Sequence, residues 1–229
     1  MKSETLKQLL ADRAAKRPVV LATWLDGGRE ELLYPGEDNA VDGPLVTAAA
    51  EAVRSDKSNT VETDDGNVFL HVFNPPLRMA IVGAVHIAQP LSQMAVLAGY
   101  DVTVIDPRGA FASEDRFPGI NLSDDWPDEA MEKLAPDART AVVLLTHDPK
   151  LDDPALAVAL KARPFYIGAL GSSRTHAKRK DRLTAEGFND EDFARIHGPV
   201  GLAIGAKSPA EIAVAIMAQV TEVLRRGAS

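Results

Sequence analysis

The sequence predicts an α/β protein in two parts: a small α+β N-terminal domain over residues 1–75, and a parallel sheet with helices on both faces over residues 76–229. The first part contains short strand patterns separated by tight turns, whereas the second alternates strand and helix patterns. Pro75 and Pro76 stand between the two parts. Because successive prolines stiffen the chain and cannot continue a sheet ladder, we place the domain boundary there.

The N-terminal part has the signals of helices and hairpins. Helical spacing of apolar residues predicts an amphipathic helix over residues 6–17. A hairpin is expected over residues 19–34, a second helix over residues 44–53, and two short strands over residues 60–73 around the turn Asp64-Asp65-Gly66. These elements make up the predicted α+β domain.

The second part reads as repeated strand–helix units. Strands are predicted over residues 79–82, 101–105, 140–145 and 165–167, with helices over residues 86–98 and 154–162. Such alternation is typical of a Rossmann-like parallel sheet. A last helix is expected over residues 209–226, with Ser208 as N-cap, Pro209 at its first position and Glu211 in its first turn.

The composition limits the possible chemistry and partners. The chain has no cysteine, which excludes a disulfide framework, a thiolate metal site and a cysteine nucleophile. A net charge of -8 argues against nucleic acid as a partner. The N-terminus lacks the apolar core of a signal peptide, and no segment approaches the length of a membrane span. We therefore expect a cytoplasmic protein with no membrane partner.

The turn after the first strand resembles an altered dinucleotide fingerprint. The three places that require small residues are Gly83, Val85 and Ala88, and the β-branched Val85 stands where phosphates would come closest. Asp106 follows the second strand, where an acidic residue can bind a ribose hydroxyl. Two interpretations stay open: a bound dinucleotide, or a scaffold with a closed or repurposed cofactor site in which Asp106 only caps a loop.

Two polar residues near these strand ends are further candidate ligand-binding residues. His86 could donate to a phosphate or carbonyl oxygen, or it could merely cap or pack. Arg108 could clamp a phosphate or carboxylate, or form a salt bridge with Asp106.

The segment Thr146-His147-Asp148 places three polar side chains directly after an apolar strand, a common position for acid/base groups or ligands. The alternative is that Asp148 and Asp152 cap the next helix. His86 and His147 lack a recognisable ligand spacing, so we assign no metal and no catalytic residue.

A fourth group lies in a glycine- and serine-rich turn that leads into a basic helix. Gly168, Gly171, Ser172 and Arg174 could form an anion cradle at the start of that helix, with Lys178 one turn from Arg174. For the neighbouring Arg179 and Lys180 we expect a solvated helix face.

Six segments in order resemble the XdhC/CoxI family, the accessory factors of xanthine dehydrogenase and related molybdenum hydroxylases. The resemblance spans about residues 70–225. The six segments are Gly83–Ala88, Val104–Arg108, Arg116–Pro118, Leu145–Asp148 with Leu151-Asp152, Ile167–Ser172 and Gly198–Gly205.

The resemblance implies a chaperone-like protein that binds the molybdenum cofactor (molybdopterin) as cargo and assists its sulfuration or its insertion into the apo-enzyme. The implied partners are that apo-hydroxylase and a sulfurase, and we expect a homodimer. The family normally has glycine at the position of Val85 and a Gly-Gly-Cys-Val-Glu-like segment in its N-terminal domain, which this chain lacks. One alternative function is an NAD(P)- or FAD-dependent oxidoreductase. A second is an interaction module in which the small N-terminal domain docks a partner or mediates dimerisation and the cleft is vestigial.

Overall fold

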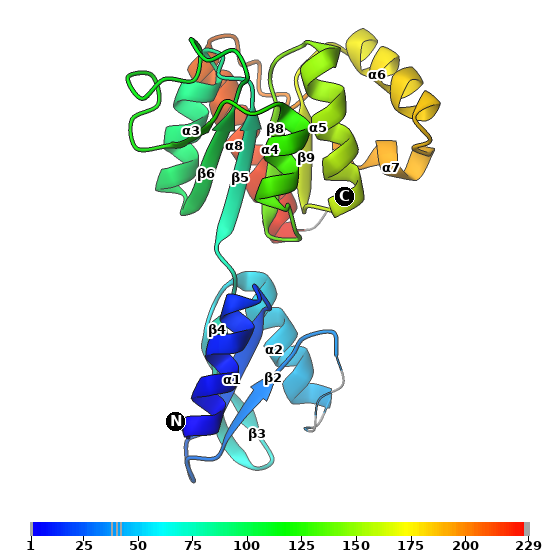
Figure 1. The fold of residues 1–229 in the computed structure, drawn as a ribbon. Coiled ribbons are helices and arrows are strands. Elements are labelled where there is room, and N and C mark those ends of the chain that lie inside the picture. The colour runs from blue at the N-terminus through cyan, green and yellow to red at the C-terminus, as the bar shows by residue number, and fades with distance from the viewer. Residues whose placement is uncertain (1, 38, 40, 42, 227–229) are drawn as a thin grey trace. The chain divides into compact units, whose positions relative to one another are not determined.

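The structure is a computed structural model that describes residues 2–37, 39, 41 and 43–226. The chain divides into two compact units, residues 1–75 and residues 76–229 (Figure 1). Within the described residues, no helix is long and apolar enough to cross a membrane.

The first unit is an antiparallel sheet with two helices. Its strands are in the order β2-β1-β4-β3, and buried residues such as Val20, Leu33 and Leu70 form its core with Leu45 and Ala49 of the second helix. The elements of this unit are α1 (Ser3–Ala14), β1 (Val19–Trp24), β2 (Glu30–Leu33), α2 (Gly43–Ser55), β3 (Asn59–Thr63) and β4 (Gly66–Phe73).

The second unit is a six-stranded sheet in the order β10-β9-β8-β5-β6-β7, and its strands pair in parallel. The elements of this unit are β5 (Leu77–Val82), α3 (Ala88–Leu97), β6 (Tyr100–Ile105), β7 (Asn121–Ser123), α4 (Pro127–Leu134), β8 (Thr140–Leu144), α5 (Pro149–Ala162), β9 (Tyr166–Ala169), α6 (Ser173–Ala185), α7 (Asp190–Ala194), β10 (Ile196–His197) and α8 (Pro209–Arg226). This is the usual strand order of a dinucleotide-binding fold.

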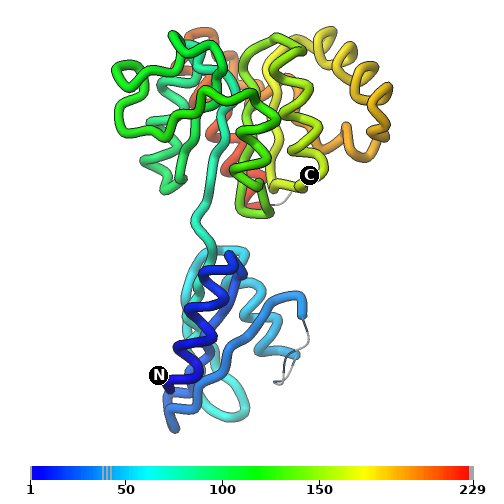
Figure 2. Tube along the Cα trace, in the orientation of Figure 1, coloured from blue at the N-terminus to red at the C-terminus, as the bar shows by residue number. Residues whose placement is uncertain are grey.

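Helices cover both faces of this sheet. Because side chains alternate along a strand, Met79 and Ile81 of β5 face a core shared with α3 and α8, whereas Ala80 and Val82 face a core shared with α4 and α5. Figure 2 colours the chain from its N-terminus to its C-terminus, with α3 in green and α8 in red. These two helices pack together on the same face of the sheet. The predicted Rossmann-like α/β fold is confirmed.

Several predicted boundaries are wrong. The helix predicted from residue 154 begins at Pro149, because Asp148 caps it by accepting a 3.0 Å hydrogen bond from the Lys150 amide and Pro149 suits the first helical position. Pro154 is accommodated inside this helix. β9 extends to Ala169, so the glycine-rich turn begins later than predicted. Four short elements, β7, α4, α7 and β10, were not predicted from the sequence.

The start of α8 agrees with the prediction. The hydroxyl of Ser208 accepts a 3.3 Å hydrogen bond from the Glu211 amide, and the Glu211 carboxylate accepts 2.8 Å bonds from the amides of Lys207 and Ser208. These reciprocal bonds satisfy amides that a helix start leaves free.

Candidate functional site

The strand order reverses direction between β5 and β8, which lie side by side in the middle of the sheet. β5 is followed by α3 on one face and β8 by α5 on the other, and ligands of such sheets bind outside the carboxyl ends of these strands. We call the segments Gly83–Ile87, Asp106–Arg108 and Thr146–Asp148 the switch-point edge. Most of the predicted site residues lie in these segments.

Gly83 forms the tight turn after β5. Its φ is +106°, its amide donates a 2.8 Å hydrogen bond to the carbonyl of Ile105, and a Cβ at this position would lie 2.7 Å from Cγ2 of Thr146. Only glycine adopts this conformation cheaply and leaves room for its neighbour. The turns after β5 and β8 are therefore in direct contact.

The helix after this turn has an uncapped N-terminus. α3 begins at Ala88, two residues later than predicted, and the residue before it, Ile87, makes no side-chain cap. His86 is exposed in the turn, while Val85 is partly buried and packs against the core shared with α3 and α8. The Ala88 amide donates a 3.0 Å hydrogen bond to the carbonyl of Val85, and Pro90 has no N–H, so the Gln89 amide and the helix dipole are what this first turn offers to an anion.

The carboxylate of Asp106 is fully hydrogen-bonded to neighbouring groups of the same chain. It is 0% exposed and accepts hydrogen bonds from the Ala84 amide at 2.8 Å, the Arg108 amide at 3.0 Å, and the Arg108 guanidinium at 2.8 and 2.7 Å. Burial by itself raises the pKa of Asp106, but the bonds from Arg108 and Ala84 outweigh it and hold the pKa below its ordinary value. Asp106 thus caps the Gly83 turn, and Arg108 makes the salt bridge that was the alternative to a ligand clamp.

The segment after β8 is held by its own hydrogen bonds. The hydroxyl of Thr146 donates a 2.6 Å hydrogen bond to Asp152 and accepts a 3.1 Å bond from the Asp148 amide. His147 is exposed and has a left-handed backbone, with φ of +62°. Asp148 caps α5, in line with its alternative interpretation, and its charge raises the pKa of Arg108, after the larger effect of the Asp106 hydrogen bonds.

Arg179 is not on a solvated helix face, so that expectation is wrong. Its side chain is 2% exposed and lies 3.5 Å from the equally buried carboxylate of Asp152, while its guanidinium donates a 3.1 Å hydrogen bond to the carbonyl of Leu170. Burial raises the pKa of Asp152 and lowers the pKa of Arg179. The two side chains connect the loop after β8 with the loop after β9.

The glycine- and serine-rich group is only partly assembled at the sheet edge. Gly168 lies inside β9, where a Cβ would meet Tyr166 and Val200 at 2.5 Å, so its role is to allow packing. Gly171 has a φ of +142°, and Ser172 caps α6 by accepting a 3.2 Å hydrogen bond from the Thr175 amide. Arg174 is exposed in the first turn of this helix.

The switch-point edge therefore suits an anionic ligand. It combines the uncapped start of α3 with the exposed side chains of Arg108, His86 and His147. Among the described residues there is no group of three or more His, Cys, Asp or Glu side chains that could hold a metal ion. The buried partner of Asp152 could not be found from the sequence, because nothing local marks a cation that pairs across two helices.

Comparisons with known proteins identify relatives of this chain. The chain is 34% identical over 151 residues to the molybdenum cofactor insertion chaperone PaoD of Escherichia coli, covering 66% of this chain and 41% of that protein. It is 31% identical over 161 residues to a Bacillus subtilis protein named as a probable subunit of xanthine dehydrogenase, covering 70% of this chain and 47% of that protein. The chain thus spans less than half the length of these curated relatives.

A solved structure matches across both units. The crystal structure of a xanthine dehydrogenase from Bacillus halodurans superimposes with a TM-score of 0.70 at 25% identity, covering 97% of this chain and 67% of that chain. The family described as XdhC Rossmann domain matches residues 79–220, which hold all three segments of the switch-point edge. On this match, the chain belongs to the XdhC family.

Proposed function

We propose that this chain binds the molybdenum cofactor at the switch-point edge and assists its insertion into a xanthine dehydrogenase-type enzyme. The observation that carries the proposal is membership of the XdhC family, together with 34% identity to a protein named as a molybdenum cofactor insertion chaperone. The Bacillus subtilis relative is named as a probable subunit of xanthine dehydrogenase, which supports an enzyme of this class as the one that receives the cofactor.

The chemistry of the residues fits this cargo. The pterin cofactor carries a phosphate, and the uncapped first turn of α3 offers the Gln89 amide and the helix dipole to such an anion. His86, His147 and Arg108 are exposed nearby and can donate further hydrogen bonds, while Arg174 provides a second cation at the start of α6. In this proposal, the phosphate lies at the Gly83–Ile87 turn.

Sulfuration of the cofactor requires a second protein in this proposal. The chain has no cysteine, so it cannot carry sulfur as a persulfide. Its role would be to hold the cofactor while a sulfurase supplies the sulfur and the apo-hydroxylase accepts the product. The predicted homodimer stays a prediction.

Retention of released cofactor tests the proposal directly. The purified chain is mixed with cofactor released from a denatured molybdenum hydroxylase and passed over a sizing column, and the pterin in each fraction is measured by fluorescence after oxidation. We expect the pterin to elute with the protein. No co-elution, together with normal hydroxylase activity in a deletion strain, would overturn the proposal.

Matched variants locate the site. His147→Asn and Arg174→Gln remove exposed donors, and asparagine tolerates the left-handed backbone at residue 147. We expect each to retain less pterin than the parent protein. The control is His71→Asn, which removes an exposed histidine from β4 of the other unit and should leave retention unchanged.

A further inference from the structure

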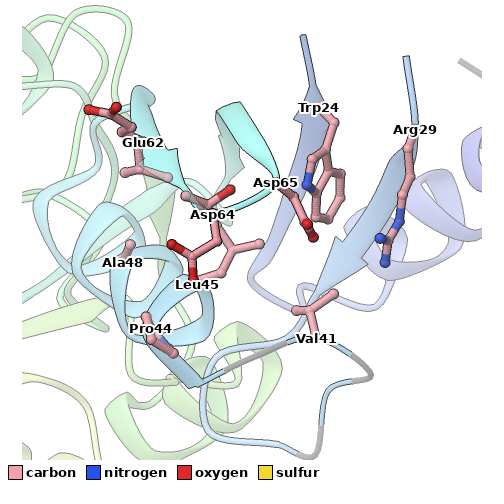
Figure 3. Close-up of a pocket in the computed structure, with 11 residues that line it drawn as sticks. Trp24, Arg29, Val41, Pro44, Leu45, Ala48, Glu62, Asp64 and Asp65 are labelled. Atoms are coloured by element: carbon pink, nitrogen blue, oxygen red, sulfur yellow. The ribbon is translucent and has the colours of Figure 1, made fainter. Parts of the chain in front are cut away.

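The first unit contains a pocket that the proposed function does not use. Its volume is about 570 Å³, which lies within the range of roughly 300 to 1,000 Å³ typical of ligand sites. Figure 3 shows the pocket between the sheet and α2. The lining residues are Trp24, Arg29, Val41, Pro44, Leu45, Ala48, Val61, Glu62, Thr63, Asp64 and Asp65.

The charges of this pocket suit a cation. Asp64 and Asp65 contribute two carboxylates to its lining, against the single guanidinium of Arg29. That guanidinium is already paired with Glu31 at 2.8 Å and lies 4.2 Å above the ring of Trp24. An anionic pterin phosphate would be repelled here, whereas a lysine or arginine side chain would be attracted.

Trp24 provides an aromatic wall with an unused donor. Its side chain is 7% exposed, and its indole Nε1 has no hydrogen-bond partner among the residues that the structure describes. Buried tryptophan N–H groups usually find a partner. A small rearrangement of the wall on binding would allow a carbonyl of an incoming chain to accept this hydrogen bond.

The pocket lies beside an edge strand. Val61, Glu62 and Thr63 belong to β3, which is the last strand in the order β2-β1-β4-β3 and pairs with β4 alone within the described residues. Thr60 and Glu62 are exposed on this strand. An extended peptide can add to such an edge and place alternate side chains in an adjacent pocket.

We propose that this pocket binds an extended segment of a partner protein in which an apolar or aromatic side chain stands next to lysine or arginine. The apolar side chain packs against Trp24, Leu45 and Val61, and the basic group lies against Asp64 and Asp65. The first unit is then a docking module that prefers positively charged ligands, whereas the switch-point edge suits anionic ones. This assignment does not rest on the proposed function of the second unit.

Trp24 reports directly on occupancy. The chain has two tryptophans, and the other, Trp126, lies in the second unit and is 54% exposed. In a Trp126→Phe variant of the full chain, the fluorescence of Trp24 is titrated with a seven-residue peptide of alternating phenylalanine and lysine. The matched peptide replaces each lysine with glutamate, and spermidine serves as a cation without apolar side chains.

We expect a saturable change in Trp24 fluorescence with the basic peptide alone. Replacing both carboxylates in Asp64→Asn/Asp65→Asn should weaken this binding by between about twofold and about thirtyfold, because two exposed ion pairs are lost. As a control, Asp181→Asn/Glu186→Gln removes two exposed charges from the region of α6 and should leave the affinity unchanged. Equal binding of the acidic peptide, equal binding of spermidine, or no saturation by about 1 mM basic peptide would overturn the assignment.

Discussion

Asp152 of α5 and Arg179 of α6 lie 3.5 Å apart, and each side chain is 2% exposed. Asp152 accepts a hydrogen bond from Thr146 after β8, and Arg179 donates one to the carbonyl of Leu170 after β9. The pair therefore connects the loop after β8 with the loop after β9 at the carboxyl end of the sheet.

Removing the cation of this pair should strongly destabilise the fold. Arg179→Met leaves the buried Asp152 carboxylate without its counter-charge, and we expect the free energy of unfolding to fall by about 3 to 5 kcal/mol, measured by urea denaturation at pH 8. Lys178→Met, on the exposed face of the same helix, is the control and should change stability by less than about 0.5 kcal/mol.

The defect of Arg179→Met should shrink on acidification. Burial raises the pKa of Asp152 in the folded protein, so the folded state binds this proton more tightly than the unfolded state does. Lowering the pH through the folded-state pKa then favours folding, and loss of Arg179 moves that pKa further up. Urea denaturation from pH 8 down to pH 5 measures the difference between the variant and the parent, and a gap that widens on acidification would contradict this account.

Asp106→Asn should have the opposite pH dependence. The pKa of Asp106 is held below its ordinary value, so the carboxylate stabilises the fold above about pH 4, and this stability is lost as the pH falls through the lowered pKa. We expect the variant to be about 2 kcal/mol less stable than the parent at pH 7, with a smaller difference at pH 3. Urea denaturation at both pH values measures this, with the exposed Asp124→Asn as a control that should stay near the parent.

Gly83→Ala tests the contact between the turns after β5 and β8. The added Cβ would meet Thr146 at 2.7 Å and would have to adopt a φ of +106°. We expect a loss of about 2 to 3 kcal/mol in thermal or urea unfolding. Gly99→Ala is the matched control, because Gly99 also has a positive φ of +87° but nothing within 4 Å of the added atom. Equal losses in the two variants would show that the contact with Thr146 contributes nothing to the loss of stability.

Nucleotide cofactors should not stabilise this protein. The Asp106 carboxylate that would bind a ribose is 0% exposed and already engaged by Arg108 and Ala84. A ligand at 100 times its Kd adds about 2.7 kcal/mol, or roughly 5 to 10 °C in Tm for a chain of this size. We expect no such shift with NAD, NADP or FAD, and a clear rise in Tm with any of them would reopen the oxidoreductase interpretation.

The elements predicted best are those with local signals. β5 and β6 are short apolar runs bounded by turn residues, and α8 carries its own start signals at Ser208 and Glu211. The predicted start of α5 at Pro154 is too late, because Asp148 and Pro149 form the actual start of this helix. β7 is only three residues long and has no buried residue, so its pattern is too weak to predict.

The partners of the site residues could not be predicted in the same way. The turn at Gly83 follows from the sequence, but the contact of Gly83 with Thr146 depends on two strands that are neighbours only in the folded sheet. The burial of Arg179 likewise depends on the packing of α6 against α5, since its neighbours in sequence are basic and mostly exposed. Residue type and spacing therefore predict the candidate segments, but they do not show which side chains are already paired within the fold and which can bind a ligand.

The bonds between Asp106 and Arg108 bear on the proposed function, in which the protein would alternate between loaded and empty states. In many binding sites a buried charge is satisfied only when the ligand is present, so release leaves it unpaired at a cost of several kcal/mol. Here the carboxylate has its donors within its own chain. Under the proposed function, departure of the cargo would leave Asp106 as well satisfied as before, so this residue would set no energetic barrier to handing the cargo over.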